Sequence, residues 1–111
     1  MIRRSHTALV ERNIEWSGAF ATEPYEAGWA SEALFFVRTL RPATLSPNAS
    51  AVVQVSPDGM VWCDEGTVVS LQGDLGQTFC RVREFGGWLR LAGHLPPGET
   101  LAVTVYLVLK E

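Results

Sequence analysis

Apolar and polar residues alternate with a period of two along most of this chain. In the final stretch, Leu101–Leu109, every second residue is Leu or Val, and these side chains fall on one side of an extended backbone. Leu89 and Leu91 likewise share one face, whereas Trp88 and Arg90 share the other. This period predicts a β-strand in both stretches.

The stretch Ala51–Trp62 predicts a β-hairpin. Val53 and Val55 alternate with polar residues, and the tetrapeptide Ser-Pro-Asp-Gly follows at positions 56–59. Its residues suit a type I turn, because proline presets φ, aspartate bonds its own backbone and glycine accepts a positive φ. A three-residue loop of this kind reverses a strand, so we expect the return strand to begin with Met60–Trp62.

Other parts of the chain favour strands separated by loops. Strand patterns cover residues 7–16, 29–40, 66–71 and 78–85. In the first of these, the even positions from Ala8 to Trp16, Ile14 included, are expected to face inward, with Arg12 out of pattern. Segments 17–28 and 43–49 contain Gly, Pro or Asn and predict loops, the first held down by Phe20 and Tyr25.

These elements amount to seven or eight short strands with no convincing helix. Such a pattern is typical of an all-β antiparallel sandwich or jelly roll rather than a βαβ fold. The length of 111 residues suits one domain. We expect residues 1–6 to form a flexible N-terminal arm and residues 7–111 to form the single sandwich domain.

Charge and hydropathy exclude several classes of partner. The net charge of −3 provides no basic footprint for nucleic acid. The longest apolar run, Leu101–Leu109, is too short for a membrane helix, and no apolar segment follows the basic N-terminal residues as in a secretory signal. We therefore expect a protein that is made in the cytoplasm and has no membrane partner.

The two cysteines are too few for a disulfide framework. Cys63 and Cys80 would pair only if their strands were neighbours. The alternative, which we favour, is two semi-buried thiols in a reducing compartment.

Candidate catalytic and metal-binding residues are sparse. The two histidines, His6 and His94, lie outside any nucleophile motif, so both are interpreted as surface residues and no enzymatic activity is expected. Asp58, Asp64 and Glu65 flank the hairpin but lack the spacing of a calcium loop, and zinc ligands are absent. The sequence therefore predicts no metal and no cofactor.

Four tryptophans suggest one alternative function. Trp16 and Trp62 occupy strand positions that core packing explains. Trp88 shares a face with Arg90, and Trp29 lies at the end of a loop. Flat aromatic rings stack on sugars, so a carbohydrate-binding module with Tyr25, Trp29 and Trp88 as its platform is the alternative to the function favoured below.

The side of the final strand that should face water is unusually apolar. Ala102, Tyr106 and Val108 lie there, and a soluble monomer seldom exposes such residues together. Covering by another protein subunit, foremost a second copy of the chain, would shield them and prevent edge-to-edge aggregation. The expected interface residues are Arg3 and Arg4 of the arm, Trp88, Arg90, Tyr106 and Val108.

Two segments resemble parts of known small β-sandwich domains. Residues 53–62 are similar to a V-x-x-S-x-D-G-x-x-W hairpin, and residues 85–91 resemble the later G-R-Y-V-R-V-type strand of the same domains. Discoidin-like, galactose-binding-like jelly rolls share this pair with short proteins encoded among tailed-phage and prophage structural genes. The chain resembles the phage group more closely in size, and it lacks the cysteines that bracket discoidin-like domains.

The resemblance to the phage group implies a non-catalytic structural or assembly protein. Its members would be capsid-decoration or tail accessory components that act by protein–protein contacts. Expected partners are further copies of the chain and capsid or tail proteins, and the expected location is the virion or the host cytoplasm. In this setting the Arg3-Arg4 arm would reach an acidic patch on a neighbouring subunit.

Overall fold

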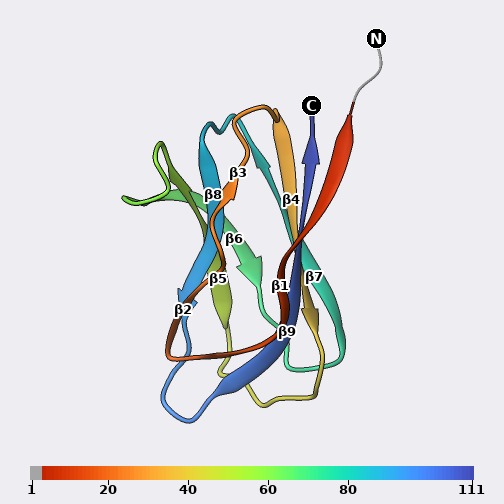
Figure 1. The fold of residues 1–111 in the computed structure, drawn as a ribbon. Helices are drawn as coiled ribbons and strands as arrows, with labels where there is room; N and C mark the ends of the chain where they lie inside the picture. Colours follow the sequence, from red (N-terminus) through yellow and green to blue (C-terminus); the bar gives the residue numbers. More distant parts are fainter. Residues whose placement is uncertain (1–3) are drawn as a thin grey trace.

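The computed structural model describes residues 4–111, which form nine strands in two antiparallel sheets packed face to face (Figure 1). This confirms the predicted all-β sandwich, with one or two strands more than expected. Residues 4–111 contain no helix long and apolar enough to cross a membrane. The strands are β1 (Ser5–Ser17), β2 (Ala19–Ala21), β3 (Tyr25–Glu26), β4 (Glu32–Thr39), β5 (Ser50–Ser56), β6 (Cys63–Ser70), β7 (Gly76–Arg83), β8 (Trp88–His94) and β9 (Thr100–Lys110).

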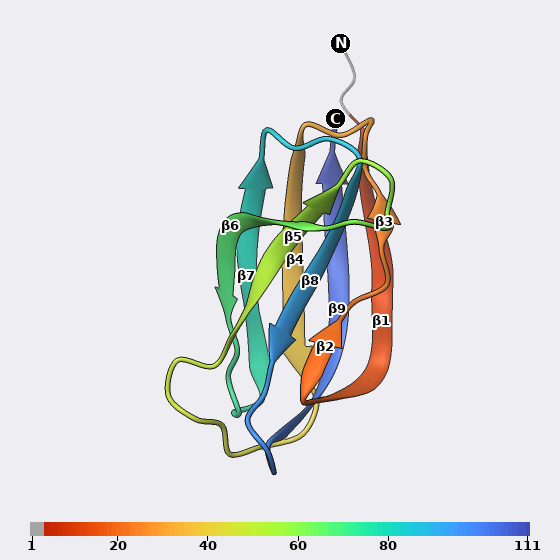
Figure 2. The same ribbon diagram turned by 90° about the vertical axis from the view of Figure 1, so that its left-hand side faces the viewer.

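The first sheet has the strand order β1-β9-β4-β7, and the second has the order β2-β8-β5-β6, with β3 also paired to β8. Figure 2 shows the second sheet in front of the first. Strands β9 and β4 are therefore central, and β1 and β7 form the edges of the first sheet. Because β9 has a paired strand on each side, it is not an edge strand, and its long apolar sequence is protected from edge-to-edge association.

The core lies between the sheets and follows the predicted alternation. Leu101, Val103, Val105, Leu107 and Leu109 of β9 all point into it and are at most 1% exposed. The second sheet contributes residues from β5 and β8, and β4 contributes further apolar side chains. The other fully buried large side chains of the core are Trp16, Phe35, Val37, Val53, Val69, Val82, Leu89, Leu91 and Leu95.

Strand β1 differs from the single alternating strand that the sequence predicts. Its pairing with β9 shifts register twice, between Leu9 and Glu11 and between Glu11 and Ile14, and Asn13 has a φ of 49°. Each β-bulge adds a residue on one strand and changes the phase of the side chains. Between the two shifts Glu11 lies opposite the buried Val105, and after the second shift Ile14 lies opposite the buried Val103, so the even positions face inward again as expected. Ile14 is nevertheless 36% exposed, on a strand at the edge of the sheet.

The segment predicted to be one loop, residues 17–28, contains two short strands, β2 and β3. Both pair with β8, so this segment completes an edge of the second sheet. Phe20 packs against the core as expected and stacks on Trp16, with ring centroids 4.1 Å apart. A glycine at position 93 makes room for it, since a Cβ there would lie 2.6 Å from the Phe20 ring.

The β5–β6 hairpin has the predicted turn residues but a longer loop. Ser56 Oγ accepts the N–H groups of Asp58 and Gly59, and Asp58 Oδ1 accepts those of Met60 and Val61. Gly59 has a φ of 79°, which confirms its predicted role. The return strand begins only at Cys63, so the expectation of a strand from Met60 onward is wrong.

The cysteines lie in different sheets and are not bonded to each other. Cys63 is exposed at the start of β6, and Cys80 is buried on β7. Burial raises the pKa of the Cys80 thiol to about 11. The preferred prediction of two thiols is confirmed, although only one of them is buried.

Candidate functional site

The outer face of the β1-β9-β4-β7 sheet carries a row of four large side chains that crosses all of its strands. Leu9 on β1 is opposite Tyr106 on β9, which is opposite Phe36 on β4, which is opposite Phe79 on β7. We call these four residues the aromatic row. Leu9 is 46% exposed and Phe79 is 50% exposed, so the row is open to solvent at both ends. The Phe36 and Phe79 rings stack, with centroids 5.6 Å apart.

A second row runs beside it and extends the apolar surface. It consists of Thr7, Val108, Leu34 and Arg81, again one residue from each strand. A shallow depression of about 330 Å³ opens on the same face. The depression is lined by Thr7, Phe36, Arg38, Gln77, Tyr106 and Val108.

Arginines lie on the aromatic rings of this face. The Arg38 guanidinium is 5.1 Å from the centroid of Tyr106, and its Nη1 donates to the Tyr106 hydroxyl at 3.4 Å. Arg38 Nε also donates to Gln77 Oε1 at 3.1 Å, which fixes the guanidinium in place. The Arg81 guanidinium is 5.5 Å from the Phe79 centroid. Arginine and aromatic side chains in contact are typical of the residues that contribute most to protein interfaces.

The outer face of the other sheet is built differently. Arg90 Nε donates to Gln54 Oε1 at 2.8 Å, and Gln54 Nε2 donates to Asp64 Oδ1 at 2.9 Å. The Arg90 guanidinium lies 4.3 Å from the Trp62 centroid. Trp62 is thus partly exposed beside an arginine, and the expectation that it belongs to the core is wrong. Trp88 is half-buried, and its ring lies 3.2 Å from where a Cβ of Gly59 would be.

The structure therefore divides the residues that the sequence assigns to one interface. Tyr106 and Val108 lie on the first outer face, whereas Trp88 and Arg90 lie on the second. Arg4 lines a hollow at the open end of the sandwich, and Arg3 lies outside the described residues. Trp88 and Arg90 therefore do not share a face with Tyr106 and Val108, because β8 and β9 belong to different sheets.

Sequence reasoning missed three members of the aromatic row: Leu9, Phe36 and Phe79. The available signal was that the residues of β7 alternate between Cys80 and Val82 on one side and an aromatic residue with arginines on the other. That pattern marks Phe79 as outward-facing, but only the strand order shows that it lies beside Phe36.

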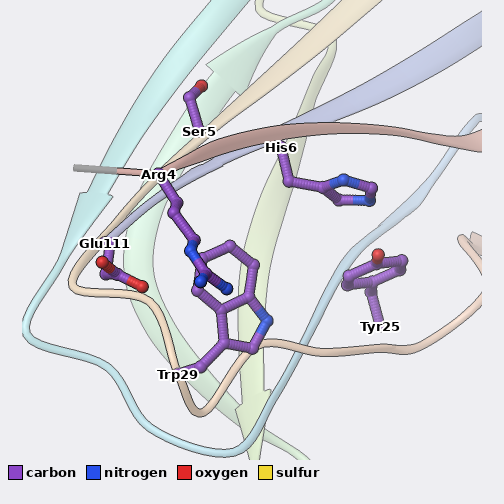
Figure 3. A pocket seen from close by; sticks show the side chains of 6 residues that line it. All are labelled: Arg4, Ser5, His6, Tyr25, Trp29 and Glu111. Carbon is purple, nitrogen blue, oxygen red and sulfur yellow. The ribbon is translucent and has the colours of Figure 1, made fainter. Parts of the chain in front are cut away.

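The hollow at the open end lies between β1 and the segment around β3, as Figure 3 shows, and has a volume of about 610 Å³. Its lining includes Tyr25 and Trp29, two of the three predicted sugar-stacking residues. The His6 ring stacks on Tyr25 with centroids 6.3 Å apart. Trp88 is absent from the lining because it pairs with Glu26, one position along from Tyr25, and so faces the opposite side of the sheet. The predicted three-residue platform is thus reduced to two residues.

The remaining candidate residues are the two histidines and the acidic residues near the β5–β6 hairpin. Both histidines are exposed, as predicted, with His94 at the end of β8. Asp58 serves its turn, and hydrogen bonds to the Met60 and Val61 N–H groups lower its pKa. Asp64 and Glu65 accept hydrogen bonds from Gln54 and from the Thr67 backbone. Within residues 4–111, no three His, Cys, Asp or Glu side chains are grouped so that they could hold a metal ion.

Comparison with protein-family models and with curated proteins finds no match to this sequence. The candidate function therefore depends on the two surface features described above. One is the aromatic row with its flanking arginines, and the other is the aromatic hollow at the open end of the sandwich.

Proposed function

We propose that this protein is a non-catalytic assembly subunit whose outer β1-β9-β4-β7 face packs against a second copy of the chain. The observation that supports this most is the aromatic row, because Leu9 and Phe79 expose about half of their surface at its two ends. Burying such side chains releases roughly 25 cal/mol for each Å² of apolar surface removed from water. The flanking arginines supply polar contacts at the rim of the same face.

The aromatic row is complementary to itself. A two-fold axis that lies in the interface, parallel to the strands, reverses the order of the row between the two copies. Leu9 then faces Phe79 of the second copy, and Tyr106 faces Phe36 of the second copy. A closed dimer of this kind uses one patch twice, as two-fold interfaces do.

The charged residues near the C-terminal end of β9 are also complementary under this two-fold axis. The outward residues near the end of β9 form the order Ser5, Lys110, Glu32, Arg83 across the four strands. The two-fold axis places Lys110 opposite Glu32 of the second copy and Ser5 opposite Arg83. Lys110 and Glu32 carry opposite charges and therefore attract each other across this interface, which favours a second copy over a partner of unrelated charge pattern.

The size of the face sets the strength of the contact. Four strands about 4.8 Å apart and eight residues of about 3.3 Å each give a flat area of roughly 500 Å². Standard interfaces bury about 800 Å² on each partner, and smaller ones are weak or transient. We therefore expect a dimer with a dissociation constant in the micromolar range, strengthened where many copies assemble side by side.

The resemblance of residues 53–62 and 85–91 to small phage β-sandwiches extends the proposal to a capsid-decoration or tail accessory protein. In this setting, weak contacts between copies add up because a particle lattice holds the subunits at high effective concentration. Capsid or tail proteins are the further partners, and the virion or the host cytoplasm is the location. Mass spectrometry of purified phage particles tests this part of the proposal. Peptides of this protein should be present in the particles at a stoichiometry that repeats between preparations. Particles that lack these peptides contradict the assignment to the virion.

Sedimentation equilibrium of the whole chain tests the contact surface. The wild type should change from monomer to dimer as its concentration rises through the micromolar range. Phe36→Glu places a charge at the centre of the row and should keep the protein monomeric at every concentration. The matched control is Val68→Glu, because Val68 is 54% exposed on β6 in the other sheet. A monomeric wild type, or equal loss of association in both variants, contradicts the proposal, provided that circular dichroism shows both variants folded.

A further inference from the structure

The hollow at the open end continues the space between the two sheets. Along β1, Ala8 is buried and faces the core, so the alternation places Arg4 and His6 on the same inward side. Tyr25 is opposite Leu89, a fully buried residue, and therefore also points between the sheets. Positions that would normally carry aliphatic residues thus carry side chains with polar ends, around a space that the chain itself does not fill.

Trp29 is held at the edge of this space by a rigid turn. Ala27 and Ala30 on either side of it are buried, and the Ala30 N–H donates to the Ala27 carbonyl at 3.0 Å. The Ala27 N–H donates to the Gly87 carbonyl at 2.7 Å, and the Ser31 N–H donates to the Lys110 carbonyl at 2.9 Å. The turn is thereby tied to both sheets, yet Trp29 itself is 44% exposed. Holding the backbone of Trp29 in place lowers the entropy that this residue loses when a ligand binds.

The polar groups that line the hollow include one positive and one negative side chain. Arg4 provides a guanidinium, Glu111 a carboxylate, and His6 and Tyr25 groups that can donate or accept a hydrogen bond (Figure 3). The Glu111 N–H donates to the Arg4 carbonyl at 3.0 Å, so the backbone pairing of β1 with β9 continues to the rim. With a cation and an anion side by side, the hollow favours a neutral polar ligand over a phosphate or another strongly charged group.

We infer that this hollow binds a neutral pyranose residue of a glycan, a function separate from self-association on the outer face. One side of a pyranose ring presents C–H groups that form a flat apolar surface, which suits the exposed ring of Trp29 and the ring of Tyr25. Its hydroxyls pair with charged planar groups such as those of Arg4 and Glu111. The volume of about 610 Å³ lies within the range of small-molecule sites, and aromatic walls with a few polar groups are their usual lining.

An array of neutral and acidic oligosaccharides tests this inference with the intact chain. The wild type should bind at least one neutral glycan on the array, and titration of that glycan should change the tryptophan fluorescence. Trp29→Ala should weaken binding by about tenfold or more, because truncating an aromatic contact at the centre of a site costs more than about 1 kcal/mol. Trp62→Ala is the matched control, since it removes a partly exposed tryptophan on the outer face of the other sheet, and its binding should equal that of the wild type.

The result can be separated from the proposed self-association. Phe36→Glu should retain the glycan affinity of the wild type, because the aromatic row lies on the opposite side of β1 from His6. Absence of binding to every glycan on the array overturns the inference, as does binding that survives Trp29→Ala with unchanged affinity. Binding confined to acidic glycans overturns the neutral class of ligand. In each case the sedimentation result for the outer face is unaffected.

Discussion

The two outer faces of the sandwich carry similar residue types but use them in opposite ways. On the β2-β8-β5-β6 sheet, Arg90 is joined to Gln54 and stacked on Trp62, so its polar and aromatic groups satisfy each other within the chain. On the β1-β9-β4-β7 sheet, the aromatic row ends in Leu9 and Phe79, which remain about half exposed. An arginine beside an aromatic ring is therefore not by itself the mark of an interface. What distinguishes the two faces is the contiguous apolar surface that the chain leaves uncovered.

The loop between β5 and β6 accounts for this difference between the two outer faces. Residues 57–62 between β5 and β6 bring Trp62 back over β8, where it covers Arg90. No comparable loop returns over the aromatic row in the described part of the chain, because the connections of the first sheet lie at its ends (Figures 1 and 2). The first face thus keeps the aromatic row open to a partner.

The largest expected effect is a difference in folding stability between substitutions on the inner and the outer side of β9. Leu107→Ala removes a fully buried side chain from the core and should lower the free energy of unfolding by about 2–5 kcal/mol. Val108→Ala, on the outer face, should lower it by less than about 1 kcal/mol and should instead weaken self-association. Chemical denaturation gives the first quantity and sedimentation the second. Equal destabilisation by the two substitutions would show that the outer face is as well packed as the core.

A pair of arginine substitutions should separate the two faces. Arg90→Ala breaks the contacts to Gln54 and Trp62 and should cost about 1 kcal/mol of folding stability, with no change in association. Arg38→Ala should change stability by no more than about 0.5 kcal/mol and should weaken the dimer, since Arg38 orients Tyr106 at the interface. If Arg90→Ala also weakened association, the second face would belong to the contact surface as well, and the two faces would not differ in this respect.

The smallest effect concerns the loop that covers the second face. Hydrogen bonds from the Met60 and Val61 N–H groups, followed by that of the Ser56 hydroxyl, hold the pKa of Asp58 below its ordinary value of 3.8. A lowered carboxyl pKa means that the folded state favours the carboxylate. The resulting stabilisation is present above the ordinary value and is lost as the pH falls through the lower, folded-state pKa.

Asp58→Asn should therefore leave a shallower loss of stability in acid than the wild type shows. Thermal unfolding followed from neutral pH to about pH 2 measures this. The amide oxygen still accepts the loop N–H groups, so the melting temperature at neutral pH should fall only slightly. Identical acid profiles for the two proteins would show that the Asp58 carboxylate contributes nothing to the loop.

The sequence predicted those parts of the fold that local patterns determine. The alternation from Leu101 to Leu109 predicted the buried side of β9, and the Ser-Pro-Asp-Gly turn predicted the position of the hairpin. The bulges in β1 could not be predicted, because a positive φ at Asn13 depends on the pairing with β9 rather than on the local pattern. Strands β2 and β3 have three and two residues, which is too short to show a period.

The candidate surfaces were only partly predictable for a related reason. Tyr106 and Val108 were found because they lie on one strand with a visible apolar face. The aromatic row needs four strands that are far apart in sequence, and only their order in the sheet brings Leu9, Phe36 and Phe79 together. In the hollow, Tyr25 and Trp29 were found as aromatic residues near a loop, whereas Arg4 and His6 acquire their position from the pairing of β1 with β9.

The most direct test of the self-association proposal is disulfide cross-linking across the predicted two-fold axis. Two variants carry Cys63→Ser to remove the exposed thiol, and one adds Leu9→Cys while the other adds Phe79→Cys. When they are mixed and mildly oxidised, we expect a disulfide-linked dimer that contains one chain of each kind and forms faster than with a Val68→Cys control on the other face. No linked dimer from Leu9→Cys and Phe79→Cys, or a faster one from Val68→Cys, would contradict the assignment of this face as the contact between copies.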